Sequence, residues 1–158
     1  MDEALSIFPA TARGALISSA RPMLRPSGVI HQSDYYRVEV LAISRVVKVT
    51  RLGRPFESQE MLNAVCEPVQ LALDSAGRRS HRLLIDTRLA IGNNKPDYEA
   101  WFEVHRRRML LGFPRVALVV KSAIGKLHVD RLLSGAKLER TPRVFLDEGL
   151  AMRYLAEE

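Results

Sequence analysis

The polar side chain with the clearest chemical prospect in this sequence is Asp86, which ends the apolar run Leu83-Leu84-Ile85. Open α/β sheets bind ligands outside the carboxyl ends of their strands, so a carboxylate there can belong to a binding site. It can equally accept hydrogen bonds from the amides of the loop that follows. A second apolar run ends at Val120, and the two ends should meet. We therefore predict a partner- or anion-binding group made of Asp86, Thr87, Arg88, Lys121 and Ser122.

No residue pattern predicts catalysis, a metal or a cofactor. The histidines at positions 31, 81, 105 and 128 have no paired spacing, and Cys66 is the single cysteine, so clustered metal ligands and an internal disulfide are excluded. The segment from Lys121 to Lys126 lacks the first glycine of a phosphate-binding loop, and Ser122 is interpreted as a helix cap. An enzyme with Asp86 as general base is the remaining alternative, and it requires His81 or His128 beside that carboxylate.

The charge balance is basic, with a formal net charge of +6. The charges are spread along the chain, and the run Arg106 to Arg108 comes without a nucleic-acid-binding motif or stacking aromatic residues. We interpret it as a solvated helix face and expect no nucleic-acid partner. No apolar run is long enough to span a bilayer, and the start of the sequence lacks the basic and apolar regions of a secretory signal. These features, with the single cysteine, predict a cytoplasmic protein.

Hydrophobic periodicity predicts the elements that position these residues. Residues 1–27 are interpreted as a leader, and residues 28–158 as a single domain. The predicted order is ββαβαβαβα, an α/β fold with helices packed on a mixed sheet. Its elements are a hairpin of strands 36–40 and 46–52, a helix from Ser58 to Gly77 bent at Pro68, a basic loop 78–82, a strand 83–86, a loop 87–95, a helix that Pro96 starts, a strand 116–120, a helix capped by Ser122, a strand 143–146 and a helix capped by Asp147.

Each predicted helix has an apolar stripe that should face the sheet. In the helix after Pro96 the stripe comprises Tyr98, Trp101, Phe102, His105 and Met109. In the next helix it comprises Ile124, Leu127, His128, Val129, Leu132 and Leu133. In the last helix it comprises Leu150, Ala151, Tyr154 and Leu155.

This succession of elements resembles the STAS domain of anti-sigma-factor antagonists, and more closely the SpoIIAA-like (STAS/SEC14-type) bacterial proteins. The resemblance runs from Val29 to Leu155. It depends on the strand ending in Leu-Ile-Asp86, the Val-Ala-Leu-Val-Val strand, and the closing segment Val144 to Glu148 with Tyr154, where those proteins often have Trp. In the antagonists a kinase phosphorylates a serine at the start of the helix after the Asp-ended strand. Here that region is Gly92-Asn93-Asn94-Lys95, which has no hydroxyl, so the phosphoswitch is not carried over.

The resemblance implies a non-enzymatic regulatory domain that binds a partner protein through the Asp86 loop and the start of the helix after Val120. The SEC14-type likeness implies an alternative, a protein that binds a lipid or small apolar ligand. This alternative requires a pocket between the sheet and the helices that carry Leu62 to Leu73 and Tyr98 to Met109.

Overall fold

The computed structural model describes residues 27–92, 97–138 and 140–158. Within them the chain forms one six-stranded sheet in which the strands lie in chain order. The first three strands are antiparallel and the last four run parallel, with β3 shared by both sets. The strands are β1 (Gly28–Gln32), β2 (Tyr36–Leu41), β3 (Val46–Arg51), β4 (Arg82–Asp86), β5 (Val116–Val119) and β6 (Arg143–Phe145).

The α/β class and the hairpin are confirmed, and the structure adds one strand to the predicted order. Strand β1 pairs with β2 in antiparallel fashion, and its register shifts between Val29 and His31, as in a β-bulge. The strand lies at the sheet edge and no residue in it is fully buried, so its sequence lacks the alternation that marks a half-buried strand. The predicted leader lies outside the described residues, except for Ser27.

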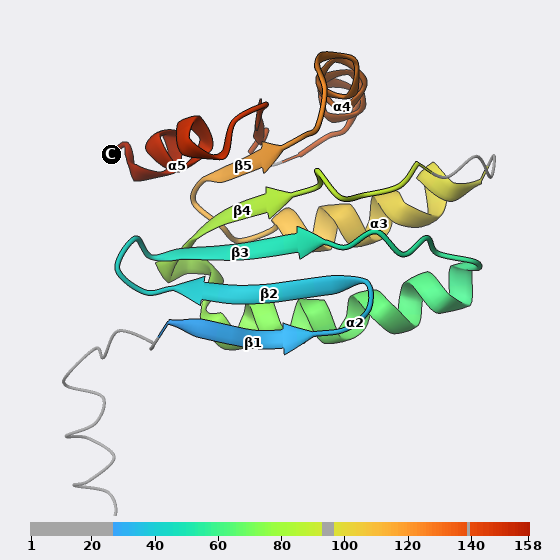
Figure 1. Ribbon diagram of the computed structural model, residues 1–158, viewed down its shortest axis with the longest axis horizontal. Helices are drawn as coiled ribbons and strands as arrows, with labels where there is room; N and C mark the ends of the chain where they lie inside the picture. The colour runs from blue at the N-terminus through green and yellow to red at the C-terminus, as the bar shows by residue number, and fades with distance from the viewer. Residues whose placement is uncertain (1–26, 93–96, 139) are drawn as a thin grey trace, which may run out of the picture.

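Helices cover both faces of the sheet (Figure 1). On one, which we call the helical face, α2 (Gln59–Ala76), α3 (Tyr98–Leu110) and α4 (Ala123–Gly135) pack against side chains such as Val38, Val47, Leu83 and Leu118. On the other, the α5 face, α5 (Glu148–Ala156) packs against Val46, Leu84, Ala117 and Val119. Successive strand residues therefore alternate between two separate cores.

Three predicted helix caps are confirmed. Ser58 Oγ accepts from the Met61 amide, Ser122 Oγ from the Gly125 amide, and Asp147 Oδ1 from the Leu150 amide. Each satisfies an otherwise unpaired amide of the first helical turn. The first helix also ends at Gly77, whose φ of 95° suits glycine.

Two other predictions concern the first helix and the segment after it. Helix α2 continues through Pro68 as a single element. The basic segment that follows is not an open loop but a 3₁₀ turn, Arg78–Ser80, because Arg78 is held there by the last carbonyls of α3, those of Arg108, Met109 and Leu111. Pro96 lies outside the described residues.

The inward stripe predicted for α4 is partly wrong. Ile124 is 81% exposed and Leu127 is 60% exposed, and His128 is also exposed. Helix α4 lies at the β6 edge and enters the helical-face core only through Val129 and Leu133, so the sheet cannot cover its first two turns. Leu150 in α5 was likewise predicted to point inward, but it is 51% exposed, whereas Ala151 and Leu155 are buried.

Candidate functional site

Asp86 lies on the α5 face at the end of β4, and Arg88 engages it fully. The Arg88 amide and Nε each donate to Asp86 Oδ1 at 3.0 Å, and an Arg88 terminal nitrogen donates to Oδ2 at 2.7 Å. Both carboxylate oxygens therefore accept from one residue two positions along the chain. The capping role considered for Asp86 is observed, with a bidentate guanidinium added to it.

Two further charges complete this group, which we call the Asp86 cluster (Asp86, Arg88, Lys48 and Glu148). Lys48 Nζ lies 2.6 Å from Glu148 Oε1 and 4.0 Å from Asp86 Oδ2, and Arg88 lies 3.4 Å from the same Glu148 oxygen. Burial opposes ionisation of Asp86, but the hydrogen bonds from Arg88 and the charges of Arg88 and Lys48 outweigh it and lower the pKa of the carboxyl. The cluster contains two acids and two bases that neutralise one another.

The structure does not bring the five predicted site residues into one group. Thr87 lies on the opposite face from Asp86, and its hydroxyl and amide both donate to the Val119 carbonyl at 2.9 Å. The Ser122 hydroxyl accepts from the amide of its own helix. Lys121 is exposed. Of these five residues, only Asp86 and Arg88 are hydrogen-bonded to each other through their side chains.

The histidine partner required for general-base catalysis is not found beside Asp86. His81 Nδ1 lies 2.9 Å from the Gly77 carbonyl oxygen, and His128 belongs to the other face. Within the described ranges no three His, Cys, Asp or Glu side chains gather as a metal site would require. In that same part of the chain no helix is both long and apolar enough to cross a membrane.

A cavity of about 390 Å³ opens on the helical face, between the strand ends, the loop after Asp86, α3 and α4. Its walls are mainly apolar. The ligand-binding alternative required a pocket between the sheet and the helices α2 and α3. The observed cavity lies against α3 and α4 instead, and α2 contributes no lining residue. Its main apolar wall consists of Ile85, Met109, Leu110, Leu118, Leu132 and Leu133.

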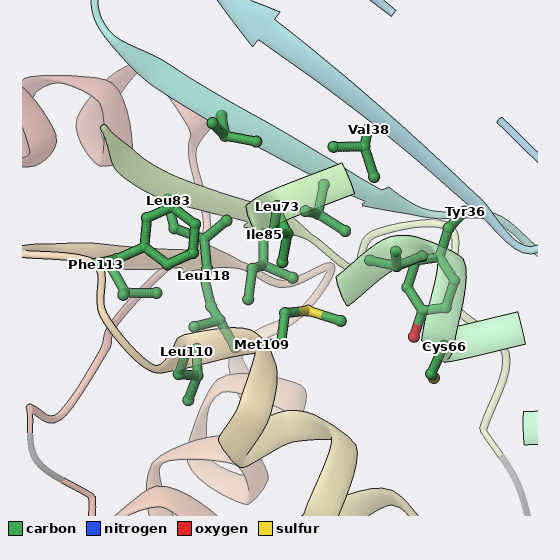
Figure 2. Packing of buried hydrophobic residues seen from close by; sticks show 14 of the residues in the cluster. Tyr36, Val38, Cys66, Leu73, Leu83, Ile85, Met109, Leu110, Phe113 and Leu118 are labelled. Carbon is green, nitrogen blue, oxygen red and sulfur yellow. The ribbon is translucent and has the colours of Figure 1, made fainter. Parts of the chain in front are cut away.

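Figure 2 shows part of this wall from within the core, with Met109 of α3 facing Ile85 of β4 and Tyr36 pointing its hydroxyl towards Cys66. Tyr36 lines the cavity and is 2% exposed, and its hydroxyl makes no hydrogen bond within standard geometry among the described residues. Burial raises the pKa of this phenol well above its ordinary value, and the nearby Arg51 charge partly opposes that rise. Burial also raises the pKa of the Cys66 thiol to about 11.

Arg51 is the most unusual polar residue of the cavity, and sequence reasoning missed it. It is 6% exposed and donates to three backbone carbonyls, those of Tyr35, Leu52 and Arg54. The signal was present in β3, where Arg51 follows Val47 and Val49 at two-residue spacing and so belongs to the same buried face. A charged residue on the same face of a strand as buried valines is unusual, and the alternation of the sequence alone would have shown it.

The cavity contains one other pair of charges. Arg106 donates to Glu99 at 2.7 Å, and both side chains line the cavity from α3. His128 contributes a polar group from α4. The arrangement therefore combines an apolar wall, a neutral ion pair and a buried guanidinium that no carboxylate of the described residues neutralises.

Comparison with solved structures finds similarity to an uncharacterized protein of the DUF3478 family from Shewanella loihica PV-4, which has a SpoIIAA-like fold. The likeness covers 82% of this chain and 92% of that chain, with a TM-score of 0.47 and 14% sequence identity. Neither protein-family models nor curated proteins give a match to this sequence.

Proposed function

We propose that this protein is a non-catalytic cytoplasmic domain that binds a small, largely apolar molecule in the cavity between the sheet, α3 and α4. The cavity itself carries the proposal. Its volume of about 390 Å³ falls within the roughly 300–1,000 Å³ of pockets that hold small ligands. Apolar side chains around a few convergent polar groups are also typical of such sites.

The state of the polar residues supports binding over catalysis. The cavity carboxylate, Glu99, is held by Arg106, and the strand-end carboxylate, Asp86, is held by Arg88. General acid–base work needs a group free to exchange its proton with substrate. The apolar wall instead supplies burial, which is worth about 25 cal/mol for each Å² removed from water.

The test is native mass spectrometry of the purified full chain, combined with thermal shift in the presence of small apolar compounds. Leu132→Trp places a larger side chain in the cavity, while Leu150→Trp makes the same change at an exposed position of α5. A bound or stabilising compound should be seen with the natural chain and Leu150→Trp, and lost with Leu132→Trp. Binding that survives Leu132→Trp unchanged, or no binding to any of the three proteins, would contradict the proposal.

A second candidate, a protein-interaction domain, is favoured by exposed apolar side chains near the cavity mouth. Leu89 and Ile91 in the loop after Asp86 are 59% and 58% exposed, and Ile124 and Leu127 in α4 are more exposed still. Exposed apolar side chains that form a contiguous patch often mark protein contact sites. Asp86 and Lys121, which the sequence predicted to serve the same role, do not form one group among the described residues, but their removal still tests that prediction.

A pull-down from the native host separates the two surfaces. Ile124→Ser with Leu127→Ser should lose the partner if the apolar surface binds it, whereas Asp86→Ala with Lys121→Ala should lose it if the strand-end group does. A partner kept by both double variants would remove both surfaces from consideration.

A further inference from the structure

We propose that the ligand of the cavity is an amphipathic monocarboxylate whose acid group is received by Arg51, with the Tyr36 hydroxyl as a second donor. This inference depends on the proposed function, because it names the chemical class that the apolar cavity binds. It is carried by the juxtaposition, in a mainly apolar cavity, of a buried guanidinium that no carboxylate of the described residues neutralises and a buried hydroxyl that has no hydrogen bond of standard geometry among those residues.

Arg51 has capacity left for an acceptor. A guanidinium has five N–H donors, and the three contacts that Arg51 makes are all to backbone carbonyls. Those carbonyls satisfy hydrogen bonds but carry no net charge. No ion pair joins Arg51 to a carboxylate among the residues that the structure describes. A buried charge is normally paired, so an anion is the group that this position lacks.

Aromatic rings hold the guanidinium in place. Its central carbon lies 4.2 Å from the ring centroid of Phe56 and 5.4 Å from that of Tyr36. Contacts of this kind stabilise a cation without neutralising it. They also restrict the side chain to one position, so a carboxylate that enters the cavity meets an orienting group that is already arranged.

The other charges of the cavity do not compete for the anion. Arg106 is paired with Glu99, so this pair contributes no net charge. The charge that remains is that of Arg51, and its influence reaches the cavity-lining phenols of both Tyr36 and Tyr98, whose pKa values it lowers against the larger effect of burial. Charge complementarity therefore selects an anionic end group.

The Tyr36 hydroxyl supplies the second donor. It is buried without a hydrogen-bond partner among the described residues, and its ring lines the same cavity as Arg51. The hydroxyl points towards the Cys66 thiol, which is only a weak acceptor, so it keeps the capacity to donate to a stronger one. A carboxylate has two oxygens and can accept from the guanidinium and the hydroxyl together.

The size of the cavity limits the apolar part. At roughly 30 Å³ per water in the liquid, 390 Å³ corresponds to on the order of a dozen waters or non-hydrogen atoms. A straight-chain acid of about ten carbons has this size. Decanoate and 1-decanol are therefore a matched pair of probes, equal in chain length and different in charge.

The experiment is isothermal titration of the full chain with decanoate and with 1-decanol. Decanoate should bind on the order of tenfold more tightly, since a charge-assisted hydrogen bond adds that much. Equal affinity for the two probes would overturn the inference and leave the proposed function standing. Failure of both probes to bind would overturn the inference together with the proposed function.

Two variants assign the selectivity to its residues. Tyr36→Phe removes a hydroxyl that makes no hydrogen bond of standard geometry among the described residues, so the fold should be retained and the preference for decanoate should fall severalfold. Arg51→Gln should abolish the preference, and Arg37→Gln, on the other face of the sheet, should leave it unchanged. If Arg51→Gln does not fold, Tyr36→Phe decides. An unaltered preference in every folded cavity variant would overturn the assignment.

Discussion

The two faces of the sheet treat polar groups in opposite ways at the end of β4. On the α5 face, Asp86 accepts three hydrogen bonds from Arg88 and belongs to a cluster of balanced charges. On the helical face, one residue further on, Thr87 borders a cavity in which, among the described residues, Arg51 has no carboxylate partner and the Tyr36 hydroxyl has no hydrogen bond of standard geometry. Two adjacent residues at the end of β4, Asp86 in the strand and Thr87 just after it, thus lead to a charge-paired cluster and to a cavity with incompletely paired donors.

This difference shows where an external ligand can gain most. A group that binds at the Asp86 cluster must first displace bonds that the protein already makes, whereas a group that enters the cavity meets donors that have no acceptor. The conspicuous carboxylate at the strand end is here already paired within the protein. The stronger candidates for binding are the polar side chains that the fold leaves incomplete.

The largest change in the free energy of unfolding is expected from matched leucine-to-alanine substitutions in the cores of the two faces. Leu155→Ala removes a fully buried side chain from the closed α5-face core and should lower the free energy of unfolding by about 3–5 kcal/mol. Leu133→Ala borders the existing cavity and should cost about 2–3 kcal/mol, because part of its surface already lacks neighbours. Urea unfolding measures both, and an equal or larger loss for Leu133→Ala would contradict the contrast.

The next effect concerns the Asp86 cluster. Asp86→Asn should lower the free energy of unfolding by about 1–2 kcal/mol, a value reduced because Arg88 is partly exposed and can be hydrated instead. Asp34→Asn breaks an exposed pair with Arg54 and is the matched control, expected to change the stability by less than about 0.5 kcal/mol. A loss for Asp86→Asn no larger than that of the control would show that the cluster is not structural.

The two faces should also respond to pH in separate windows. Burial and the Arg108 charge lower the pKa of His105, so below its ordinary value of 6.5 the unfolded chain binds more protons and the free energy of unfolding falls as pH decreases. His105→Gln should remove this slope. The Asp86 contribution is complete above the ordinary value of 3.8 and is lost as pH falls through the lowered folded pKa. Unfolding curves from pH 8 to pH 3 check both, and a single transition window for the natural chain and the variant would contradict the separation.

The smallest effect is expected at the cavity hydroxyl. Tyr36→Phe should leave the free energy of unfolding unchanged or raise it by up to about 1 kcal/mol, because it removes a buried polar group that no described residue satisfies with a hydrogen bond of standard geometry. Thermal and urea unfolding measure the change. A clear destabilisation would mean that the hydroxyl has a stabilising partner, and it would weaken the contrast between the two faces.

Local patterns in the sequence were sufficient for most of the fold. Alternation in residues 36–51 predicted the hairpin, and side-chain chemistry predicted the caps at Ser58, Ser122 and Asp147. Each of these signals lies within a few residues of the structure that it specifies. Strand β1 was missed because it lies at an edge, where none of its residues is fully buried and the sequence shows no alternation.

The site was harder to predict because it depends on tertiary contacts. Asp86 and Arg88 are two residues apart, yet the sequence did not lead us to predict that Arg88 would occupy both carboxylate oxygens of Asp86. The exposure of Ile124 and Leu127 follows from the width of the sheet under α4, which no helical periodicity reports. The burial of Arg51 could have been predicted from its two-residue spacing after Val47 and Val49 in β3. That no carboxylate of the described residues pairs with it depends on residues far away in the sequence.

The two edge strands have a consequence for association. Strand β1 carries a register shift between Val29 and His31, and β6 is only 3 residues long. Bulged and short edges are poor templates for a strand from another molecule. Sheet-to-sheet pairing, the commonest route to unwanted assembly of such folds, is thereby discouraged at both ends of this sheet.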